Sequence, residues 1–525
     1  MIRLREISMP PEHSVAQLSY EAARMLRIPN SKVRRVRLVR RSIDARKKPQ
    51  VRIVYTVDVQ VDGNEGKILK QSGCKRASLA PVSYYKPPRT AAEPRQRPVV
   101  VGFGPAGMFA ALVLALAGLR PLVLERGQDA VTRHQKVERF FATGELDPGS
   151  NVQFGEGGAG TFSDGKLNTG VNNPRIGWVL EQLVAAGAGE DILFDAKPHV
   201  GTDVLINVVQ NLRHRIQSLG GEIRFGSRVA GLQSQEGKLS ALVLDDGEVI
   251  PCEQAILAIG HSARDTFSML LNCGITMEPK PFSMGVRIEH PQSIVNCAQY
   301  GKDDPVLPPA DYKLVRHLEE ETVYTFCMCP GGYVVAAASE EGGVVTNGMS
   351  LSARDGKNAN AALLVTLHPR DFPGEDPLSG VRWQQELERR AFLAGGSNYR
   401  APAQRVGDFL DRRPSTDAGS VKPTYRPGVT WCDLHDVLPA KITEALHKAI
   451  PELDRQLKGF AQDDAVLTAP ETRSSSPVRI LRGEDKQSLS LEGLFPAGEG
   501  AGYAGGIMSA AVDGIVCAEA LMETL

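Results

Sequence analysis

Apolar and polar residues between positions 98 and 127 fall into blocks. A short apolar block, Val99–Val101, precedes a glycine-spaced turn, and an alanine-rich apolar block then runs to about Gly118. A second short block, Pro121–Leu124, ends on Glu125. Short continuous apolar blocks are typical of strands buried on both faces, and the longer block is typical of a buried helix. The pattern predicts the strand, turn, helix and strand of a parallel α/β unit.

The turn reads Gly102-x-Gly104-x-x-Gly107 and lies where a strand ends and a helix begins. In this context Gly102 permits the tight turn, Gly104 lets the backbone approach a pyrophosphate, and Gly107 lets the helix pack close to the strand. The helix N-terminus offers free N–H groups to phosphate. Glu125 follows Gly107 by 18 residues, where a carboxylate binds ribose hydroxyls and disfavours a 2′-phosphate. The motif predicts FAD or NAD rather than NADP, and a tight turn in an ordinary α/β protein is the alternative.

The same pattern recurs in two later segments. Residues 203–259 read as a helix followed by several strands, the last of which, Gln254–Ala258, is apolar and ends near Gly260. At the C-terminus the strand Leu494–Ala497 leads into closely spaced glycines and an apolar helix, Ile507–Leu521. Both segments are expected to complete the first α/β unit.

The remaining segments differ in character from this unit. Residues 275–372 contain short strand-like runs and residues 381–461 are more helical, so together they read as an insertion. Residues 1–97 read as strand, helix, strand and strand, and they end in a proline-rich linker. The expected fold class is α/β, with a Rossmann-like FAD-binding domain (98–274 and 476–525; parallel sheet flanked by helices), split by an inserted α+β substrate domain (275–475) and preceded by a small basic α+β domain (1–97).

Composition fits a soluble protein of more than one domain. A chain of 525 residues is too long for one core, and its 42% hydrophobic and 23% charged residues are typical of globular proteins. The most apolar run, Met108–Ala117, is too short to cross a bilayer, and no apolar signal segment follows the charged N-terminus. The eight scattered cysteines are therefore expected to be reduced thiols, which favours a cytoplasmic location.

Charge is uneven although the net charge is zero. Residues 1–97 hold 22 Lys and Arg against 8 Asp and Glu, with a basic cluster at 32–48. Such a cluster is suited to nucleic acid or to an anionic substrate. A solvated hairpin is favoured over both, because no aromatic residues interleave with the charges to stack on bases.

The most glycine-dense stretch is 154–168. Its glycines allow backbone conformations closed to other residues, so its N–H groups can wrap a flat or phosphorylated ligand. Asp164 and Lys166 add polar groups in the same turn. A mobile surface loop is the alternative, which the need to bury Phe154 and Phe162 disfavours.

Four motifs together resemble the two-dinucleotide-binding-domain flavoprotein superfamily, with glutathione-reductase-like FAD binding. They are the glycine turn with Glu125, the pair Arg228-Val229, the run 255–260, and the segment 494–499 with its closing helix. The stretches NVQFGEGGAGTFSDGKL, FCMCPGG, PETRSSSPVRIL and PAGEGAGYAGGI are similar to a bacterial family of FAD-dependent dehydrogenases or oxidoreductases. The resemblance implies FAD as the cofactor, but it does not name a substrate.

The resemblance also implies roles for residues at the adenosine end of the cofactor. Gly102, Gly104 and Gly107 would pack on the FAD pyrophosphate. Glu125 would bind the adenosine ribose. Val229 would contact adenine with its backbone.

At the flavin end the resemblance assigns the ribityl chain to Glu499, where the superfamily has a shorter aspartate. Gly506 and Ile507 would begin the helix whose dipole faces flavin N1 and O2 and stabilises negative charge on reduced flavin. The whole predicted FAD-binding set is Gly102, Gly104, Pro105, Ala106, Gly107, Glu125, Arg126, Gly157, Gly158, Gly160, Thr161, Asp164, Val229, Ala258, Gly260, Gly498, Glu499, Gly505, Gly506 and Ile507.

Four residues are candidates for catalysis. Cys327-x-Cys329 would exchange electrons with flavin as a dithiol, but two cysteines on one face of a strand strain a disulfide, and buried cysteines acting as small hydrophobes are favoured. His261 would serve as an acid or base, with a structural histidine as the favoured alternative. Arg473 would either anchor a carboxylate or phosphate or cap the C-terminal segment. No metal site is expected, because no histidine lies near the cysteine pair.

The sequence therefore predicts an FAD-dependent oxidoreductase that transfers hydride between a small-molecule substrate and flavin N5. No second glycine turn predicts a dedicated NAD(P)H domain. NAD(P)H still stays open as an electron donor that would reach the flavin through the inserted domain. A flavin-dependent RNA-modifying enzyme that uses the basic N-terminal domain is one alternative. A non-enzymatic flavin-binding sensor or assembly protein is the other, and the oligomeric state is not predicted.

Overall fold

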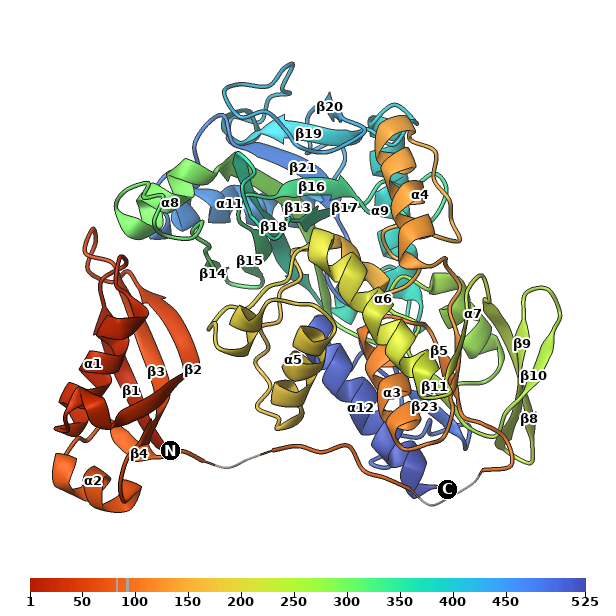
Figure 1. The fold of residues 1–525 in the computed structure, drawn as a ribbon. Coiled ribbons are helices and arrows are strands. Elements are labelled where there is room, and N and C mark those ends of the chain that lie inside the picture. The colour runs from red at the N-terminus through yellow and green to blue at the C-terminus, as the bar shows by residue number, and fades with distance from the viewer. Residues whose placement is uncertain (82–83, 91–93) are drawn as a thin grey trace.

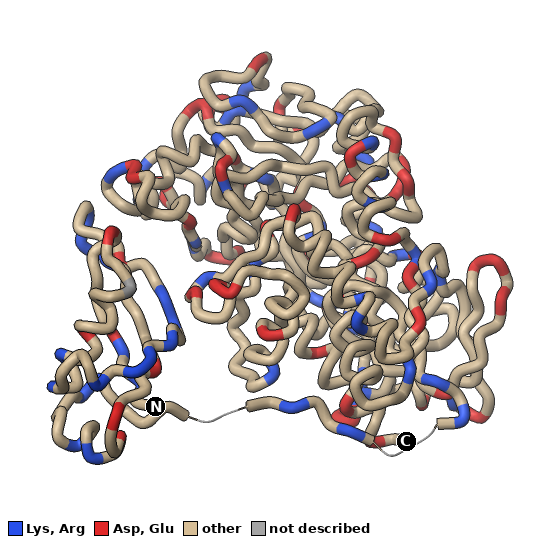
Figure 2. Tube along the Cα trace, viewed as in Figure 1, with Lys and Arg blue, Asp and Glu red and all other residues tan. Residues whose placement is uncertain are grey.

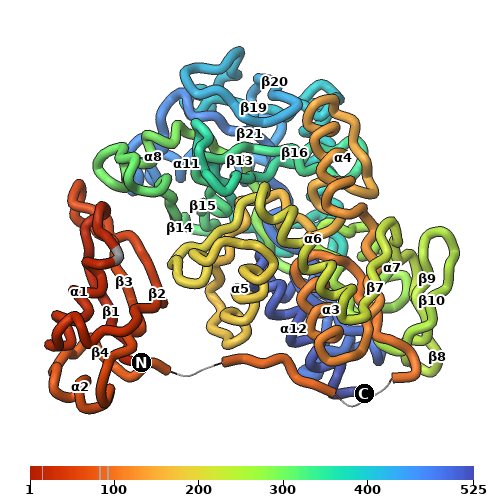
Figure 3. The backbone as a smooth tube through the Cα atoms, in the orientation of Figure 1, coloured from red at the N-terminus to blue at the C-terminus, as the bar shows by residue number. Residues whose placement is uncertain are grey.

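The computed structural model describes residues 1–81, 84–90 and 94–525, and Figure 1 shows their arrangement. The N-terminal domain stands beside the larger part of the chain, and the chain then runs along one edge of that part (Figure 3). Tyr85 hydrogen-bonds Glu519 and meets the ring of Trp178 edge-on at 5.8 Å. Residues 84–90 are thereby tied to the dinucleotide domain.

The N-terminal domain is a four-stranded antiparallel sheet in the order β2-β3-β1-β4, with two helices. Ser14 and Gln17 form a capping box that begins the first helix, and Leu18 and Leu26 of that helix are buried in the domain core. The apolar pattern predicts this helix and three of the strands, whereas α2 and β4 were not predicted from it. The elements are β1 (Ile2–Met9), α1 (Val15–Leu26), β2 (Val33–Asp44), β3 (Arg52–Val61), α2 (Glu65–Ser72) and β4 (Ala77–Leu79).

The dinucleotide domain is built on a five-stranded parallel sheet in the order β23-β11-β5-β6-β7. The last strand of the chain pairs with β11, so the C-terminal segment returns to the first α/β unit, as expected. The predicted strand, turn, helix and strand of 98–127 are all present. The elements are β5 (Val99–Val101), α3 (Pro105–Leu116), β6 (Leu122–Leu124), α6 (Thr202–Ser218), β7 (Glu222–Arg224), β11 (Ala255–Leu257), β23 (Leu494–Pro496) and α12 (Ile507–Glu523).

The two faces of this sheet are covered differently. Val100 and Val123 pack on the side of α3 and α12, whereas Val99 and Val101 pack against a three-stranded antiparallel sheet. α12 lies so close to α3 that a Cβ at Gly514 would be 2.0 Å from the Ala106 carbonyl oxygen. The second face is completed by β8 (Val229–Gln235), β9 (Lys238–Leu244), β10 (Val249–Pro251) and α7 (Arg264–Asn272).

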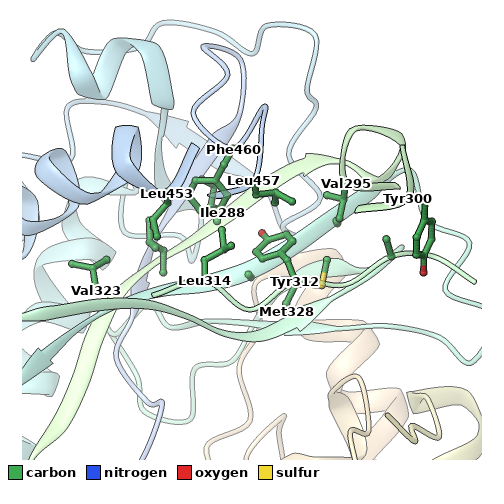
Figure 4. Close-up of a cluster of buried hydrophobic side chains, with 14 of the residues drawn as sticks. Ile288, Val295, Tyr300, Tyr312, Leu314, Val323, Met328, Leu453, Leu457 and Phe460 are labelled. Atoms are coloured by element: carbon green, nitrogen blue, oxygen red, sulfur yellow. The ribbon is translucent and has the colours of Figure 1, made fainter. Parts of the chain in front are cut away.

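The inserted segment forms a seven-stranded mixed sheet in the order β14-β15-β18-β13-β21-β19-β20. Its core includes Ile288, Tyr312, Met328 and Phe460, which Figure 4 shows packed together. The strands are β13 (Phe282–Pro291), β14 (Val315–His317), β15 (Thr322–Cys329), β18 (Asn358–Leu367), β19 (Ala401–Arg405), β20 (Val429–Trp431) and β21 (Val466–Glu471).

Helices and smaller strands complete the fold around these sheets. Within the described residues, no helix has both the length and the apolar character needed to cross a membrane. The remaining helices are α4 (Ala130–Thr143), α5 (Arg175–Ala185), α8 (Gln292–Tyr300), α9 (Ser379–Ala394), α10 (Val406–Leu410) and α11 (Ala440–Gln456), and the remaining strands are β12 (Met277–Pro279), β16 (Tyr333–Ala336), β17 (Thr346–Met349) and β22 (Val478–Ile480).

Candidate functional site

One cavity of about 600 Å³ joins the dinucleotide domain to the inserted sheet. It opens at the carboxyl ends of β5, β6 and β11 and extends to the end of β15. In open α/β sheets, ligands bind in the crevice beyond the carboxyl ends of the strands. The predicted site residues on its wall are Gly102, Gly104, Pro105, Ala106, Glu125, Arg126, Gly158, Gly160, Asp164, Val229, Ala258, Gly260, His261, Cys327, Cys329, Arg473, Glu499, Gly505, Gly506 and Ile507.

Four predicted residues lie behind the wall instead of on it: Gly107, Gly157, Thr161 and Gly498. A Cβ at Gly107 would be 1.9 Å from the Gly102 carbonyl oxygen, and one at Gly157 would be 2.0 Å from Thr161 Oγ1. These two glycines therefore serve the packing of the turns.

The three glycines of the first turn have different surroundings. Gly102 has φ +96, and a Cβ there would lie 2.3 Å from the Ala258 carbonyl oxygen. Gly104 faces the cavity, and a Cβ there would meet only Gly158 Cα, at 3.6 Å. At Gly102 and Gly107 a side chain would clash with the protein's own main chain, so packing requires glycine there. At Gly104 the space that a side chain would fill is empty.

Glu125 is 4% exposed and is held by main-chain groups. Its Oε2 accepts from Phe103 N at 2.7 Å, and its Oε1 accepts from Gly127 N at 2.8 Å and from Gly155 N at 3.0 Å. An ionised carboxylate has about four acceptor sites, so one direction remains for a further donor. Glu125 therefore joins the first glycine turn to the glycine-dense loop as well as lining the cavity.

The glycine-dense loop is firmly held. Arg133, which is fully buried, donates to the carbonyl oxygens of Asn151 at 2.8 Å and Glu156 at 2.7 Å. Phe154 and Phe162 are buried, as predicted. The alternative of a mobile surface loop is therefore wrong.

Asp164 lies at the end of this loop on the cavity wall. Its carboxylate pairs with Arg354 Nε at 3.0 Å and with Lys166 Nζ at 3.0 Å. Burial raises the pKa of this carboxyl, but the two cations outweigh burial and the net pKa is lowered. Asp164 is therefore a charged residue that positions Lys166.

The C-terminal segment contributes a second charged wall. His261 Nδ1 lies 3.5 Å from Glu499 Oε1, and the buried His261 Nε2 has no hydrogen-bond partner within the described protein. Nearby, α12 begins after Gly506, and a Cβ at Gly505 would meet no atom within 4 Å. The helix N-terminus is thus left free at this end of the cavity, and one imidazole nitrogen is buried in the wall without a partner among the described residues.

Arg473 is 7% exposed and belongs to a buried ion-pair network. Its Nη2 and Nε contact Glu388 at 2.8 and 3.1 Å, and Arg264 pairs with the same carboxylate at 2.7 and 2.8 Å. Burial opposes the charge of Glu388, but both guanidinium groups lower its pKa. These contacts favour a structural role for Arg473 over the anchoring of a carboxylate or phosphate, although its partner Glu388 lies in α9 and not in the C-terminal segment. Arg264 and Glu388 were not predicted from the sequence, because no local pattern connects positions so far apart.

The two candidate cysteines have different environments. Cys327 is exposed to the cavity, and Cys329 is 1% exposed. The interpretation as small buried hydrophobes therefore fits Cys329 and is wrong for Cys327. Both are free thiols, and the described residues contain no cluster of His, Cys, Asp and Glu that could hold a metal.

A parallel sheet, a glycine turn at its centre and a cavity at its carboxyl edge define a Rossmann-like α/β fold. Residues 281–474 match a family model described as "FAD-dependent protein, C-terminal domain-like". Residues 1–60 match a domain of unknown function (DUF8436). A Clostridium beijerinckii protein described as "Uncharacterized protein" is 46% identical over 527 residues, covering 99% of this chain and 98% of that protein. The chain belongs to the same family as this Clostridium protein, with an FAD-dependent C-terminal-like domain at 281–474.

Solved structures with a similar fold are distant in sequence. A glycine oxidase from Bacillus cereus is 9% identical with a TM-score of 0.36, covering 82% of this chain and 96% of that chain. A glycerol-3-phosphate dehydrogenase from Bacillus halodurans, complexed with FAD, is 11% identical with a TM-score of 0.36, covering 82% and 65% of the two chains.

Proposed function

We propose that this protein is an FAD-dependent oxidoreductase that transfers hydride between a small-molecule substrate and flavin N5. The observation that carries the proposal is one cavity with two unlike ends. One end is built from glycine backbone at a parallel-sheet edge, and the other is lined by side chains of the inserted sheet. A dinucleotide cofactor needs the first kind of surface and a substrate needs the second.

The residues present fit FAD at the adenosine end. The space beside Gly104 admits a pyrophosphate, and Glu125 keeps one acceptor direction for a ribose hydroxyl. Val229 lies on the wall beyond Glu125, where its backbone would contact adenine. Arg126 is already paired with Asp265 at 2.8 Å, so we assign it to the frame of the site.

At the other end, the free N-terminus of α12 at Gly506 and Ile507 would face flavin N1 and O2. Its dipole would stabilise negative charge there. Glu499 would hold the ribityl chain while it orients His261 through Nδ1. His261 Nε2, which lacks a protein partner, would then hold or release a proton toward the substrate. FAD, when bound, supplies the two-electron chemistry that these residues alone do not have.

The electron donor and the location belong to the same proposal. NAD(P)H would have to enter through the substrate end, because one parallel sheet with one glycine turn is found in the described chain. All eight cysteines are free, which supports a reducing, cytoplasmic location.

Anaerobic mixing of the purified holoprotein with NADH, NADPH and a panel of metabolites tests the proposal. We expect at least one of them to bleach the flavin absorbance rapidly. If dithionite bleaches the flavin and no member of the panel does, a non-enzymatic flavin protein is the better description.

A second candidate function rests on the N-terminal domain, where Figure 2 shows many Lys and Arg positions. Arg35 and Arg40 of β2 are exposed, whereas Arg34 and Arg37 are paired with Asp62 and Asp58. An RNA-modifying flavoenzyme would bind RNA through the exposed pair. RNA affinity should then fall with salt and fall further in Arg35→Glu/Arg40→Glu, and a salt-independent affinity would eliminate this candidate.

A further inference from the structure

The strand β15 departs from regular pairing at the wall of the cavity. Phe326 pairs with Ala362 of β18, and pairing resumes only between Cys329 and Asn360. The chain therefore advances three residues on β15, from 326 to 329, while it advances two residues on β18, from 362 to 360. This difference is a β-bulge at residues 327–328. Cys327 has φ +40, a left-handed conformation that is uncommon for a residue other than glycine. Bulges and such residues gather next to functional sites, where they redirect a side chain.

The objection to a bond between the two cysteines assumes a regular strand, and the bulge breaks that geometry at Cys327. In a regular strand, residues two apart are separated by about 6.6 Å, but a disulfide needs Cβ atoms about 4 Å apart. Here the Cys329 thiol donates to the carbonyl oxygen of Cys327 at 3.2 Å, so its sulfur already lies against the neighbouring cysteine. Cys327 itself projects into the cavity.

A buried cation lies beneath the pair. Arg287 Nη2 lies 2.9 Å from the Cys327 carbonyl oxygen and 3.8 Å from Cys329 Sγ. The protein keeps room for it, because a Cβ at Gly348 would lie 2.0 Å from Arg287 Nη2. A cation beside a thiol favours the thiolate that attacks or leaves in disulfide chemistry.

On the cavity side, the Lys166 ammonium group also favours the thiolate form of Cys327. Lys166 donates to the Met328 carbonyl oxygen, inside the bulge. The cavity walls around Cys327 desolvate its accessible thiol, and this raises the pKa of Cys327 to about 12 even though Lys166 and Arg287 act to lower it. Cys327 therefore rests as a neutral thiol, and the two cations are in place to stabilise its thiolate once the proton leaves.

We propose that Cys327 and Cys329 form a second redox centre, a dithiol that closes reversibly to a disulfide across the β15 bulge. Closure forms one S–S bond and removes two electrons and two protons from the thiols. Oxidised FAD takes up both electrons and one proton, and the other proton goes to solvent; the reverse step reopens the disulfide. The choice of FAD as the exchange partner rests on the proposed function, whereas closure of the pair does not.

Peptide mass after controlled oxidation tests closure directly. Trypsin releases residues 317–354, a peptide that contains these two cysteines and no other. The full-length holoprotein is oxidised with diamide, quenched in acid, alkylated and digested. We expect the peptide to be unalkylated and lighter by the mass of two hydrogen atoms, and doubly alkylated after dithiothreitol. Alkylation of both cysteines in the oxidised sample would overturn the proposal.

Reductive titration tests exchange with the flavin. The oxidised wild type should consume twice as much dithionite per flavin as Cys329→Ser, and the matched control Cys297→Ser, at an exposed thiol, should behave as wild type. Equal consumption by wild type and Cys329→Ser would overturn the exchange. Cys329→Ala provides the same comparison if serine at this buried position impairs folding. Failure to bind FAD would refute the proposed function and leave the peptide measurement as an independent test of closure.

Discussion

The cavity wall is mostly main chain at one end and mostly side chains at the other. At the dinucleotide end, the wall is main chain: Gly104 leaves space, and Glu125 is held by three backbone N–H groups. At the inserted end, the wall is made of side chains such as Cys327, Lys166 and Arg473. Backbone surfaces suit a cofactor of constant shape, whereas side-chain surfaces set which substrate enters. In the proposed function, the first end would hold the cofactor and the second would select the substrate.

The difference extends to how buried charge is stabilised. Glu125 is held by three main-chain hydrogen bonds and makes no direct ion pair, although the buried Arg133 acts on it electrostatically, whereas Glu388 pairs directly with two buried guanidinium groups. Removing a carboxylate of the second kind leaves uncompensated charge in the interior, which costs more than losing a hydrogen bond.

The largest effect is therefore expected at Glu388. Glu388→Ala leaves Arg473 without an ionic partner and Arg264 with Glu340 alone, and it should lower the free energy of unfolding by about 3–5 kcal/mol. Chemical denaturation measures this change, and Glu386→Ala, on the exposed side of the same helix, is the control. A loss below about 1 kcal/mol in Glu388→Ala would show that the network is not a brace.

The inserted sheet should also make the protein sensitive to acid through His290. Burial lowers the pKa of His290 from 6.5 to about 4, although Nε2 contacts the Phe460 carbonyl oxygen at 2.7 Å. Between these two values, His290 binds a proton in the unfolded chain but not in the folded chain. The contribution of neutral His290 to the free energy of unfolding therefore falls as pH drops from 6.5 toward 4. The loss should be about 2 kcal/mol between pH 8 and pH 5.

Denaturation at the two pH values measures this effect. His290→Asn should show a shallower pH dependence than wild type, and His317→Asn, at an exposed position of β14, should not differ from wild type. Equal slopes in wild type and His290→Asn would contradict the assignment.

The glycine turn offers a comparison within the first end. Gly107→Ala places a Cβ against the Gly102 carbonyl oxygen and should cost about 1–3 kcal/mol of stability. Gly104→Ala, which meets only an ordinary contact, should change stability by less than about 0.5 kcal/mol. If both variants are equally destabilised, the space beside Gly104 is not free.

The smallest effect is expected where the N-terminal domain meets the rest of the chain. Arg41 pairs with Asp195 at 2.6 Å and is partly exposed, so Arg41→Ala should cost less than about 1 kcal/mol. The matched control is Arg40→Ala, one residue earlier on β2. A larger loss in thermal denaturation would mean that the two parts fold as one cooperative unit.

The sequence predicted the first end of the cavity far better than the second. The backbone of the turn requires glycine at positions 102 and 107, so the turn can be recognised in the sequence from the spacing of its glycines. Glu388 and Arg264 meet across 124 positions of sequence, and the bulge at Cys327 follows from pairing with β18, so neither has a local signature. α2, α5 and β4 were missed because their apolar patterns are short and are completed only by tertiary packing.

The most direct measurement is the flavin content of the purified protein and of Gly104→Val. Flavin released by heat is identified and quantified by chromatography, while circular dichroism reports folding. We predict equimolar FAD in the wild type, and a folded Gly104→Val protein without FAD, because the added side chain fills the space where the pyrophosphate would lie. FMN in the wild type, no flavin after reconstitution, or full FAD in Gly104→Val would contradict the account.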